Sequence, residues 1–284
     1  MKPEVVAGVE NLILKRSQGL QFLGISWFGG EPLLAYDIVC RIMTTAGVQS
    51  RENGFLVSSN MTTNSSLLTR ERLDKLCSLG VRHFQVSFDG SREYHDTMRL
   101  RADGAGTFDA LWDRLAEVRA STSSFEYIIR IHVNEDNVTS VETLIGQLAD
   151  LIKGDPRFHV WIRPLSRFGG KNDDLLPILG DSTRPWVNPG SVVERLRMQA
   201  KSRGLLLDNL VEDVCYAAKL NTFLIRADGR LGKCTVALRD GRNSFGRILP
   251  DGSLEIDSSS AAWWSRGLLS GDMDQLACPL YARP

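Results

Sequence analysis

The sequence predicts an α/β protein built on a parallel sheet, followed by a smaller cysteine-containing region. Short apolar runs alternate with amphipathic segments of helical length up to about residue 165, and each run ends in small, polar or charged residues. This alternation implies βαβ crossovers and a parallel sheet. A (β/α) barrel and an open doubly wound sheet both fit. In either, functional groups gather beyond the carboxyl ends of the strands.

The predicted strands are rich in Ile, Val and Phe, as expected for strands of a parallel sheet that is covered on its faces. The segments between them repeat apolar residues at helical spacing, and the first sixteen residues have the same amphipathic pattern. The predicted strands are 22–28, 54–59, 83–88, 126–133 and 158–162, and the helices between them are 34–46, 69–79, 107–120 and 140–152.

Residues 169–190 are rich in Gly, Pro, Asp and Asn, which indicates a linker. We therefore expect two domains, residues 1–180 and 181–284. A helix is predicted over 191–203. Strand-like pieces at 222–226 and 231–235 follow, with Asp228-Gly229 between them as a hairpin turn.

Composition excludes several classes of partner. The 284 residues include 34 basic and 34 acidic side chains, so charge gives no reason to expect a nucleic acid or an anionic membrane as partner. No stretch approaches the ~20 apolar residues of a membrane span, and the N-terminus lacks a secretory apolar core. Five cysteines, an odd number, argue against a disulfide framework. We expect a cytoplasmic protein.

Gly29-Gly30-Glu31-Pro32 follows the first predicted strand. Paired glycines let a ligand approach the backbone closely, and a carboxylate accepts hydrogen bonds from an ammonium group. The residues alone also fit a glycine turn before a helix that starts with proline. The segment resembles a motif of the radical S-adenosylmethionine (radical SAM) family, which holds the amino group of the methionine part of the cofactor. The resemblance implies this role for Gly29, Gly30 and Glu31.

Two further segments resemble the family in the expected order. The run 62–68 (TTNSSLL) is similar to the family's Thr-Asn-Gly-Thr-Leu-Leu, with Ser65 in place of the glycine. The run from Ser87 to Gly90 is similar to its Ser-x-Asp-Gly motif. The resemblance implies that Asn64, Ser87 and Asp89 contact the cofactor.

The family motif continues with His95-Asp96 and Arg99. For His95-Asp96 we expect a local hydrogen bond rather than a catalytic pair. Arg99 fits the family motif and an ordinary surface ion pair equally well.

Cys215, Cys234 and Cys278 lie in the last quarter of the chain. With the Asp228-Gly229 turn, they resemble the SPASM domain, a cysteine-rich region that holds auxiliary [4Fe–4S] clusters in radical SAM enzymes. The resemblance implies these three thiolates as iron ligands; a zinc site of three thiolates and one further ligand remains an alternative. Cys40 and Cys77 occupy apolar helical positions, where core packing is expected.

The family's Cys-x3-Cys-x2-Cys motif, which holds the radical-generating cluster, is missing. No cysteine precedes Gly29, and Gln275 stands where the SPASM pattern has a further cysteine. We therefore expect an incomplete piece of a longer enzyme, truncated at both ends. A degenerate relative that only binds the cofactor is the alternative.

The resemblance implies that the complete enzyme uses a [4Fe–4S] cluster to cleave S-adenosylmethionine (SAM) reductively to a 5′-deoxyadenosyl radical. Its implied substrate is a peptide or protein side chain, and its implied electron donor is a protein such as flavodoxin or ferredoxin. Two alternatives stay open: an inactive SAM- or metal-binding relative, and another parallel α/β enzyme with a zinc-binding tail. A Schiff-base aldolase is disfavoured because no lysine stands at a predicted strand end.

Overall fold

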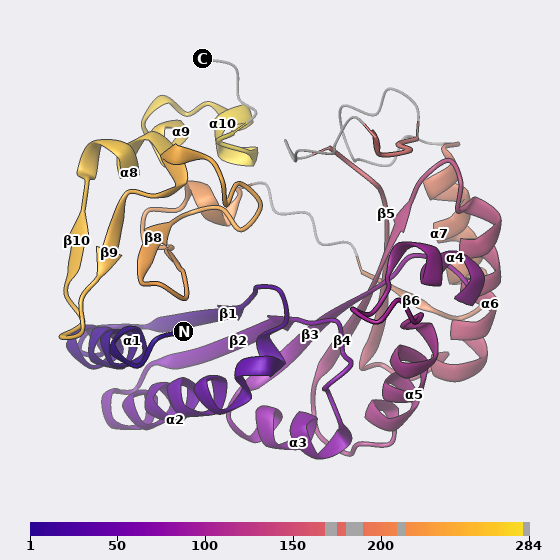
Figure 1. Cartoon of the computed structure of the whole chain (residues 1–284), viewed down its shortest axis with the longest axis horizontal. Helices are drawn as coiled ribbons and strands as arrows, with labels where there is room; N and C mark the ends of the chain where they lie inside the picture. Colours follow the sequence, from indigo (N-terminus) through magenta and orange to yellow (C-terminus); the bar gives the residue numbers. More distant parts are fainter. Residues whose placement is uncertain (168–174, 180–189, 209–213, 281–284) are drawn as a thin grey trace. The chain divides into compact units, whose positions relative to one another are not determined.

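The computed structural model describes residues 1–167, 175–179, 190–208 and 214–280 (Figure 1). These residues form two compact units, each of which is described by itself. The sheet unit contains residues 24–39 and the described residues from 57 to 208. The terminal unit contains residues 1–23 and 40–56 together with the described residues from 214 onward.

Strands and helices alternate up to β6, after which the elements become short. The strands are β1 Phe22–Trp27, β2 Leu56–Thr62, β3 Val81–Phe88, β4 Glu126–Val133, β5 Phe158–Pro164, β6 Leu206–Leu207, β7 Leu224–Ile225, β8 Arg230–Gly232, β9 Gly246–Ile248 and β10 Leu254–Ile256. The helices are α1 Pro3–Arg16, α2 Tyr36–Asn53, α3 Arg70–Ser78, α4 Arg92–Met98, α5 Phe108–Arg119, α6 Val138–Ile152, α7 Val192–Ser202, α8 Ser258–Trp264, α9 Arg266–Ser270 and α10 Met273–Ala277, and the 3-10 turns are η1 Pro32–Ala35, η3 Tyr216–Ala218 and η4 Gly241–Asn243.

Strands β1 to β6 form one sheet in sequential order, and the registered pairs from β2 to β6 are all parallel. A doubly wound sheet reverses its strand order at one point, whereas this order never reverses. Successive crossovers of one hand therefore place the helices on a single face, and Figure 1 shows α3, α5 and α6 along one side of the strands. The fold is thus α/β and of the partial (β/α)-barrel type, which confirms the prediction and decides against the doubly wound alternative.

The two faces of this sheet differ in polarity. In β4, Ile129, Ile131 and Val133 are fully buried, as expected for the face that packs against helices such as α6. Arg130 and His132 alternate with them and point to the opposite face, which we call the inner face. Among the described residues, none of the helices is both long and apolar enough to cross a bilayer.

All five predicted strands are present, with boundaries shifted by a few residues. The second predicted strand, 54–59, corresponds to β2 at Leu56–Thr62, and the predicted helix 34–46 corresponds to η1 followed by the longer α2. The pattern missed the short elements α4, β6, β9, β10 and α8 to α10. Elements of two to seven residues carry too few periodic positions to stand out in sequence.

The terminal unit joins the first helix to a four-stranded antiparallel sheet of order β10-β9-β8-β7. Asn11 Nδ2 donates to the Pro250 carbonyl at 2.8 Å, and Lys15 pairs with Asp251 at 2.9 Å. Val5 of α1 lies in one buried cluster with Leu231, Ile248 and Trp264. The predicted hairpin is confirmed: β7 and β8 are joined at Asp228-Gly229, where Gly229 has φ of +88°.

The predicted linker at 169–190 lies largely outside the described residues, which there comprise only 175–179 and Gly190. The predicted division of the chain at 180/181 also lies outside the described residues, and it stays a prediction.

Candidate functional site

Glu31 joins the loops that follow β1 and β2. Its Oε1 accepts hydrogen bonds from the Leu33 amide at 2.9 Å and the Thr63 hydroxyl at 2.8 Å, and its Oε2 accepts from the Asn64 amide at 2.8 Å. A carboxylate offers about four acceptor positions, so one remains for a further donor. Glu31 is therefore oriented by the protein and still able to bind a ligand.

Gly29 and Gly30 lie beside this carboxylate in the chain and are exposed. A Cβ added at either glycine would meet no heavy atom within 4 Å, so the space next to this backbone is open. Glu31 also caps η1, which has a proline in its first turn. The structure therefore confirms the glycine turn before a proline-started turn of helix, and the binding of a cofactor by Gly29, Gly30 and Glu31 stays a prediction.

Ser65 occupies the position where the family motif has glycine. It is the one described residue other than glycine with a positive φ, +63°, and it is fully buried. L-residues are strained in this region, which explains why the motif that this segment resembles has glycine there. The Ser65 hydroxyl lies 3.0 Å from the hydroxyl of buried Tyr127, whose pKa is raised by burial. This contact offsets the strain.

Asn64 itself is exposed, and its side-chain oxygen accepts hydrogen bonds from the amide and the hydroxyl of Ser66 at 3.0 and 2.7 Å. Its direct link to the site is its backbone amide, which bonds to Glu31. The Thr63 amide bonds to the Gln85 carbonyl at 3.0 Å, so this loop is also attached to β3.

Ser87, near the end of β3, accepts a hydrogen bond from Arg130 Nε at 3.1 Å, and the two residues are register partners. Burial lowers the pKa of Arg130 to about 10, with smaller contributions from Arg99 and Arg163. The guanidinium stays charged at neutral pH. No hydrogen bond joins its two terminal nitrogens to another described residue. Arg130 was not predicted; a cation in the middle of an apolar strand is the signal that would have found it.

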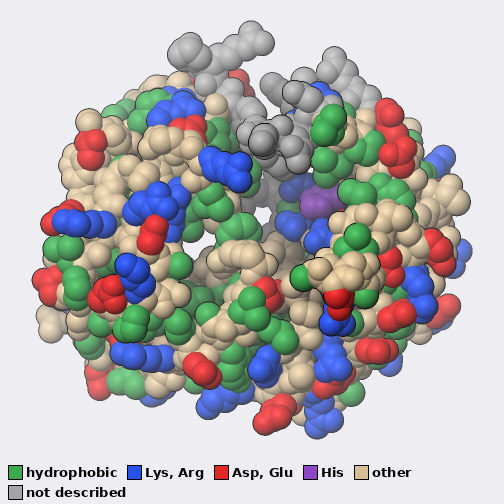
Figure 2. All heavy atoms as spheres, viewed as in Figure 1, with side chains coloured by type: hydrophobic (Ala, Val, Ile, Leu, Met, Phe, Trp, Pro, Cys, Tyr) green, Lys and Arg blue, Asp and Glu red, His purple; other side chains and the backbone are tan. Residues whose placement is uncertain are grey.

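His132 lies on the inner face two residues beyond Arg130, beside its register partner Arg163 of β5. Burial and, next, the positive charge of Arg130 hold the pKa of His132 far below its usual range, so the imidazole is neutral. The Arg163 guanidinium stacks on Trp161 at 4.8 Å. Figure 2 shows Lys and Arg side chains gathered around a His side chain. The inner face of β4 and β5 is therefore cationic.

Asp89 follows β3 directly and forms an ion pair with Arg99, with Nε–Oδ2 and Nη2–Oδ1 distances of 2.5 and 3.3 Å. The backbone carbonyl of Asp89 accepts from the side chain of buried Asn137 at 2.8 Å. Asp89 is thus held in place, and its carboxylate already has a cationic partner.

His95 and Asp96 form local hydrogen bonds, as expected. His95 Nδ1 accepts from the Asp89 amide at 3.3 Å, and His95 Nε2 lies 3.0 Å from the Thr107 hydroxyl. Asp96 accepts from the Thr107 and Phe108 amides at 2.8 and 2.9 Å, which caps α5. Both residues organise the chain after β3.

The predicted cofactor residues follow three strands that are neighbours in the sheet, β1, β2 and β3. Glu31 and Asn64 are joined by a hydrogen bond, whereas Ser87 and Asp89 contact Arg130 and Arg99 instead. Their binding of a cofactor stays a prediction.

The three later cysteines belong to neighbouring segments of the terminal unit. Cys234 is part of the buried cluster, and Cys215 packs against that cluster. The Cys215 amide donates to the Leu276 carbonyl at 2.8 Å, two residues before Cys278. No three or more His, Cys, Asp or Glu side chains among the described residues are grouped so that they could hold a metal. The three-thiol site stays a prediction.

Two more contacts join the Cys215 and Cys234 segments. The Tyr216 hydroxyl lies 2.6 Å from the Thr235 hydroxyl, and Lys233 Nζ donates to the Lys219 and Leu220 carbonyls at 2.6 and 3.2 Å. Elsewhere, Cys77 is buried and the pKa of its thiol is raised to about 11 by burial, which fits the expected packing role.

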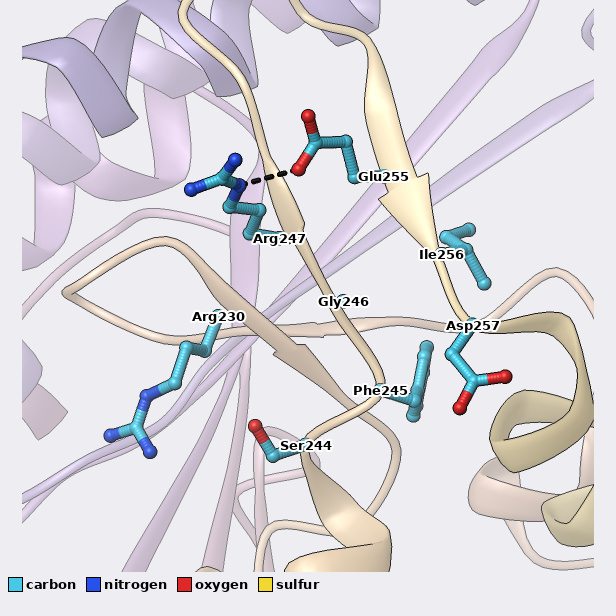
Figure 3. Close-up of a pocket in the computed structure, with 8 residues that line it drawn as sticks. All are labelled: Arg230, Ser244, Phe245, Gly246, Arg247, Glu255, Ile256 and Asp257. Carbon is cyan, nitrogen blue, oxygen red and sulfur yellow. Dashed lines mark hydrogen bonds and ion pairs between the residues drawn. The ribbon is translucent and has the colours of Figure 1, made fainter.

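A shallow hollow of about 440 Å³ lies over β8, β9 and β10 (Figure 3). Its two cations are already paired, Arg247 with Glu255 at 2.5 Å and Arg230 with Asp228 at 2.7 Å. It therefore offers little electrostatic attraction for an anion.

Residues 6–145 match the sequence model of the radical SAM superfamily. The chain is 25% identical over 245 residues to the AdoMet-dependent heme synthase of Methanosarcina barkeri. The aligned region covers 80% of this chain and 62% of that protein. The chain thus spans less than two thirds of the length of this relative.

Two solved structures share the fold. One is native anSMEcpe with bound AdoMet and the Kp18Cys peptide, with a TM-score of 0.61 and 13% identity over 92% of this chain and 72% of that chain. The other is Streptococcus suis SuiB bound to S-adenosylmethionine, with a TM-score of 0.51 and 13% identity over 87% of this chain and 56% of that chain. The fold and the sequence match agree: this chain contains a radical SAM superfamily domain.

Proposed function

We propose that the loops after β1, β2 and β3 bind SAM by its amino-acid end. The observation that carries this proposal is the Glu31 carboxylate, held by Thr63 and Asn64 beside two open glycines. Its remaining acceptor position suits the ammonium group of the ligand. A charge-assisted hydrogen bond of this kind is among the strong ones.

The other end of the amino acid is a carboxylate, and Arg130 supplies a matching donor. Its Nε bonds to Ser87, which leaves both terminal nitrogens able to form a bidentate pair with a carboxylate. Asn64 and Asp89 then line the same edge of the sheet as further polar contacts. When bound to a [4Fe–4S] cluster, SAM supplies the radical chemistry of this superfamily; the residues of this chain bind and orient it.

For the complete enzyme we propose a peptide or protein side chain as substrate and an electron-donor protein such as flavodoxin or ferredoxin as partner, in the cytoplasm. The peptide-bound anSMEcpe structure and SuiB bound to precursor peptide SuiA support this substrate class. We likewise propose that Cys215, Cys234 and Cys278 ligate an auxiliary cluster.

The cationic inner face favours a second candidate substrate, a carboxylate-bearing small molecule of the kind suggested by the heme synthase relative. Arg163 beside His132 would pair with such a carboxylate. Titration with heme, followed by its visible absorption, distinguishes the candidates: binding that Arg163→Gln weakens supports the small molecule, and binding that the substitution leaves unchanged argues against it.

The proposal is tested by SAM binding to the chain itself, measured by equilibrium dialysis. Glu31→Gln removes one charge-assisted hydrogen bond and is expected to weaken SAM binding by about tenfold or more. Methylthioadenosine lacks the amino-acid end, so its affinity is expected to stay unchanged. Glu71→Gln, at an exposed position of α3, is the matched control.

Three outcomes contradict the proposal. The first is that the wild-type chain does not bind SAM. The second is that Glu71→Gln weakens SAM binding as much as Glu31→Gln does. The third is that Glu31→Gln weakens the binding of SAM and of methylthioadenosine equally. The last would mean that Glu31 only fastens the two loops. For Arg130→Gln the corresponding comparison is SAM against decarboxylated SAM, and only SAM should lose affinity.

A further inference from the structure

Four side chains form a block on the inner face of the sheet unit: Arg130, His132, Trp161 and Arg163. Arg130 is the register partner of Trp161, and His132 is the register partner of Arg163. Residues two apart along a strand point to the same face, so the four side chains lie next to one another. Each of them is half-buried, which leaves part of its surface accessible from solvent.

This block lies in a positive electrostatic environment. Among the described residues, the charged groups that face His132 are Arg130 on its own strand, Arg163 on β5, and Asp89 and Arg99 from the segment after β3. Three guanidinium groups and one carboxylate leave a net charge of +2. The carboxylate is already paired with Arg99. An anion is therefore attracted to the side of the block that Arg130 and Arg163 form.

The two arginines of the block are oriented before any ligand binds. Arg130 Nε donates to the Ser87 hydroxyl at 3.1 Å, and the Arg163 guanidinium stacks on Trp161 at 4.8 Å. Guanidinium groups bind carboxylate and phosphate oxygens through paired N–H donors. Because these two are already held in place, little side-chain freedom is lost when they bind an anion. The block thus suits a carboxylate or a similar oxyanion.

His132 is the member of the block whose charge can change near neutral pH. Neither of its ring nitrogens has a hydrogen-bond partner among the described residues. Burial and, next, the charges of Arg130 and Arg163 oppose protonation of the imidazole and hold its pKa far below the ordinary value. An anion bound to the same arginines offsets their charge and favours the imidazolium.

We propose that Arg130, His132 and Arg163 form a proton-linked oxyanion site, in which binding of a carboxylate or a similar oxyanion is accompanied by protonation of His132. The imidazolium then donates a hydrogen bond to the bound anion. The inference rests on the proposed carboxylate contacts of Arg130 and Arg163, whichever ligand supplies the carboxylate. Linkage is reciprocal, so protonation favours anion binding by the same factor as anion binding favours protonation. The site therefore binds an anionic ligand more tightly as the pH falls.

Sulfate is the probe for this site, because it keeps its charge over the range, between about pH 7 and pH 5, in which the linked histidine takes up its proton. The full chain with isotope-labelled histidine is titrated with sulfate in a buffer free of other oxyanions. Long-range proton–nitrogen NMR spectra report both the sulfate affinity and the charge of each imidazole ring. The chain has four histidines, and the signal of His132 is assigned by its loss in His132→Gln or His132→Asn.

The affinity of wild type for sulfate should rise by about two- to tenfold between about pH 7 and pH 5, and sulfate should shift the His132 ring toward the imidazolium. His132→Gln should bind sulfate with little dependence on pH. Arg163→Gln should weaken sulfate binding and, even without sulfate, let His132 protonate at a higher pH.

His159→Gln is the matched control. His159 also lies on the inner face of β5, but its Nε2 lies 3.1 Å from the Pro156 carbonyl oxygen, so it already has a partner. Its replacement should leave the sulfate affinity and the pH dependence unchanged. The charge of the His132 ring is compared with and without sulfate in wild type, so the test does not depend on the folding of any one variant.

Competition identifies the source of the carboxylate. If SAM displaces sulfate and methylthioadenosine does not, the site takes the SAM carboxylate. If SAM and sulfate bind together, the site is left for a carboxylate of the substrate. Both results support the oxyanion site, and a chain that binds sulfate with the expected pH dependence but does not bind SAM refutes the SAM proposal alone.

Three results overturn the inference. The first is that wild type does not bind sulfate. The second is that the His132 ring stays neutral in the sulfate-bound protein at about pH 5. The third is that acidification strengthens sulfate binding as much in His132→Gln as in wild type, or that His159→Gln removes the pH dependence to the same extent.

Discussion

Replacement of Ser65 by glycine tests how this chain accommodates a serine where the motif that it resembles has glycine. The residue has a left-handed backbone, φ +63°, and its hydroxyl bonds to buried Tyr127. Glycine removes a strain of about 1–2 kcal/mol. It also adds backbone freedom to the unfolded chain, which costs about 0.4–1 kcal/mol. The backbone effect alone therefore favours glycine by about 0.5–1 kcal/mol.

The hydroxyl pair has the opposite effect. Without Ser65 Oγ, the Tyr127 hydroxyl is left buried without a partner, which costs about 1–3 kcal/mol. Ser65→Gly alone should therefore destabilise the protein by about 1 kcal/mol. In a Tyr127→Phe background the buried Ser65 hydroxyl has already lost its Tyr127 partner, so the same substitution orphans no further group and should stabilise the protein by at least about 0.5–1 kcal/mol. Ser65→Ala keeps the strain and loses the bond, so it should be the least stable of the set.

Urea unfolding of wild type, both single variants and the double variant measures this coupling. The sign of the glycine effect should reverse between the two backgrounds. If Ser65→Gly costs the same free energy with Tyr127 and with Phe at that position, the two hydroxyls are not coupled. The explanation for the serine then fails.

Two further predictions concern stability. A Cβ at Gly8 of α1 would lie 2.5 Å from the Leu249 carbonyl, whereas one at Gly47 of α2 meets only the end of Arg51 at 3.6 Å. Alanine should therefore lower the free energy of unfolding at Gly8 and raise it at Gly47, each by about 1 kcal/mol, and the thermal midpoint should move in the same direction. A rise at both positions would refute the packing of α1. Burial lowers the pKa of His95 in the folded protein. As pH falls, the imidazole therefore takes up a proton in the unfolded chain before it does so in the folded protein. Below about pH 6.5 the free energy of unfolding should fall for this reason, by at most about 1.36 kcal/mol per pH unit. His95→Gln should give a flatter dependence of the urea midpoint between about pH 7 and pH 5, and an unchanged slope would contradict this.

The strand ends of the sheet unit could be predicted because two signals coincided there. Apolar runs marked β1, β2 and β3, and polar motifs followed each run. A parallel sheet forces the carboxyl ends of its strands to one edge, so Glu31 and Asn64 were expected to lie close together without any knowledge of distances. The hydrogen bond between them confirms that expectation.

The inner face was missed for a physical reason. A strand that is covered by helices on one side only still contains many apolar residues, so β4 was interpreted as a uniformly buried run. Arg130 and His132 were not recognised as members of one face with a period of two. The contact of α1 with the sheet of the terminal unit could not be predicted from the sequence either, because the Asn11–Pro250 hydrogen bond joins residues that are 239 positions apart in the chain.

Asn137 and Asn243 show what a search for reactive side chains leaves out. Each is fully buried, and the side chain of each bonds only backbone groups. These groups include those of a proposed functional residue, the Asp89 carbonyl for Asn137 and the Cys234 amide for Asn243. A neutral amide offers two donors and two acceptors and avoids the large cost of burying a charge. It can therefore fix a turn in the interior where a charged side chain would be too costly. Neither asparagine belongs to a recognised motif, because its contribution is to hold a conformation, and that contribution becomes visible only when the partners are known.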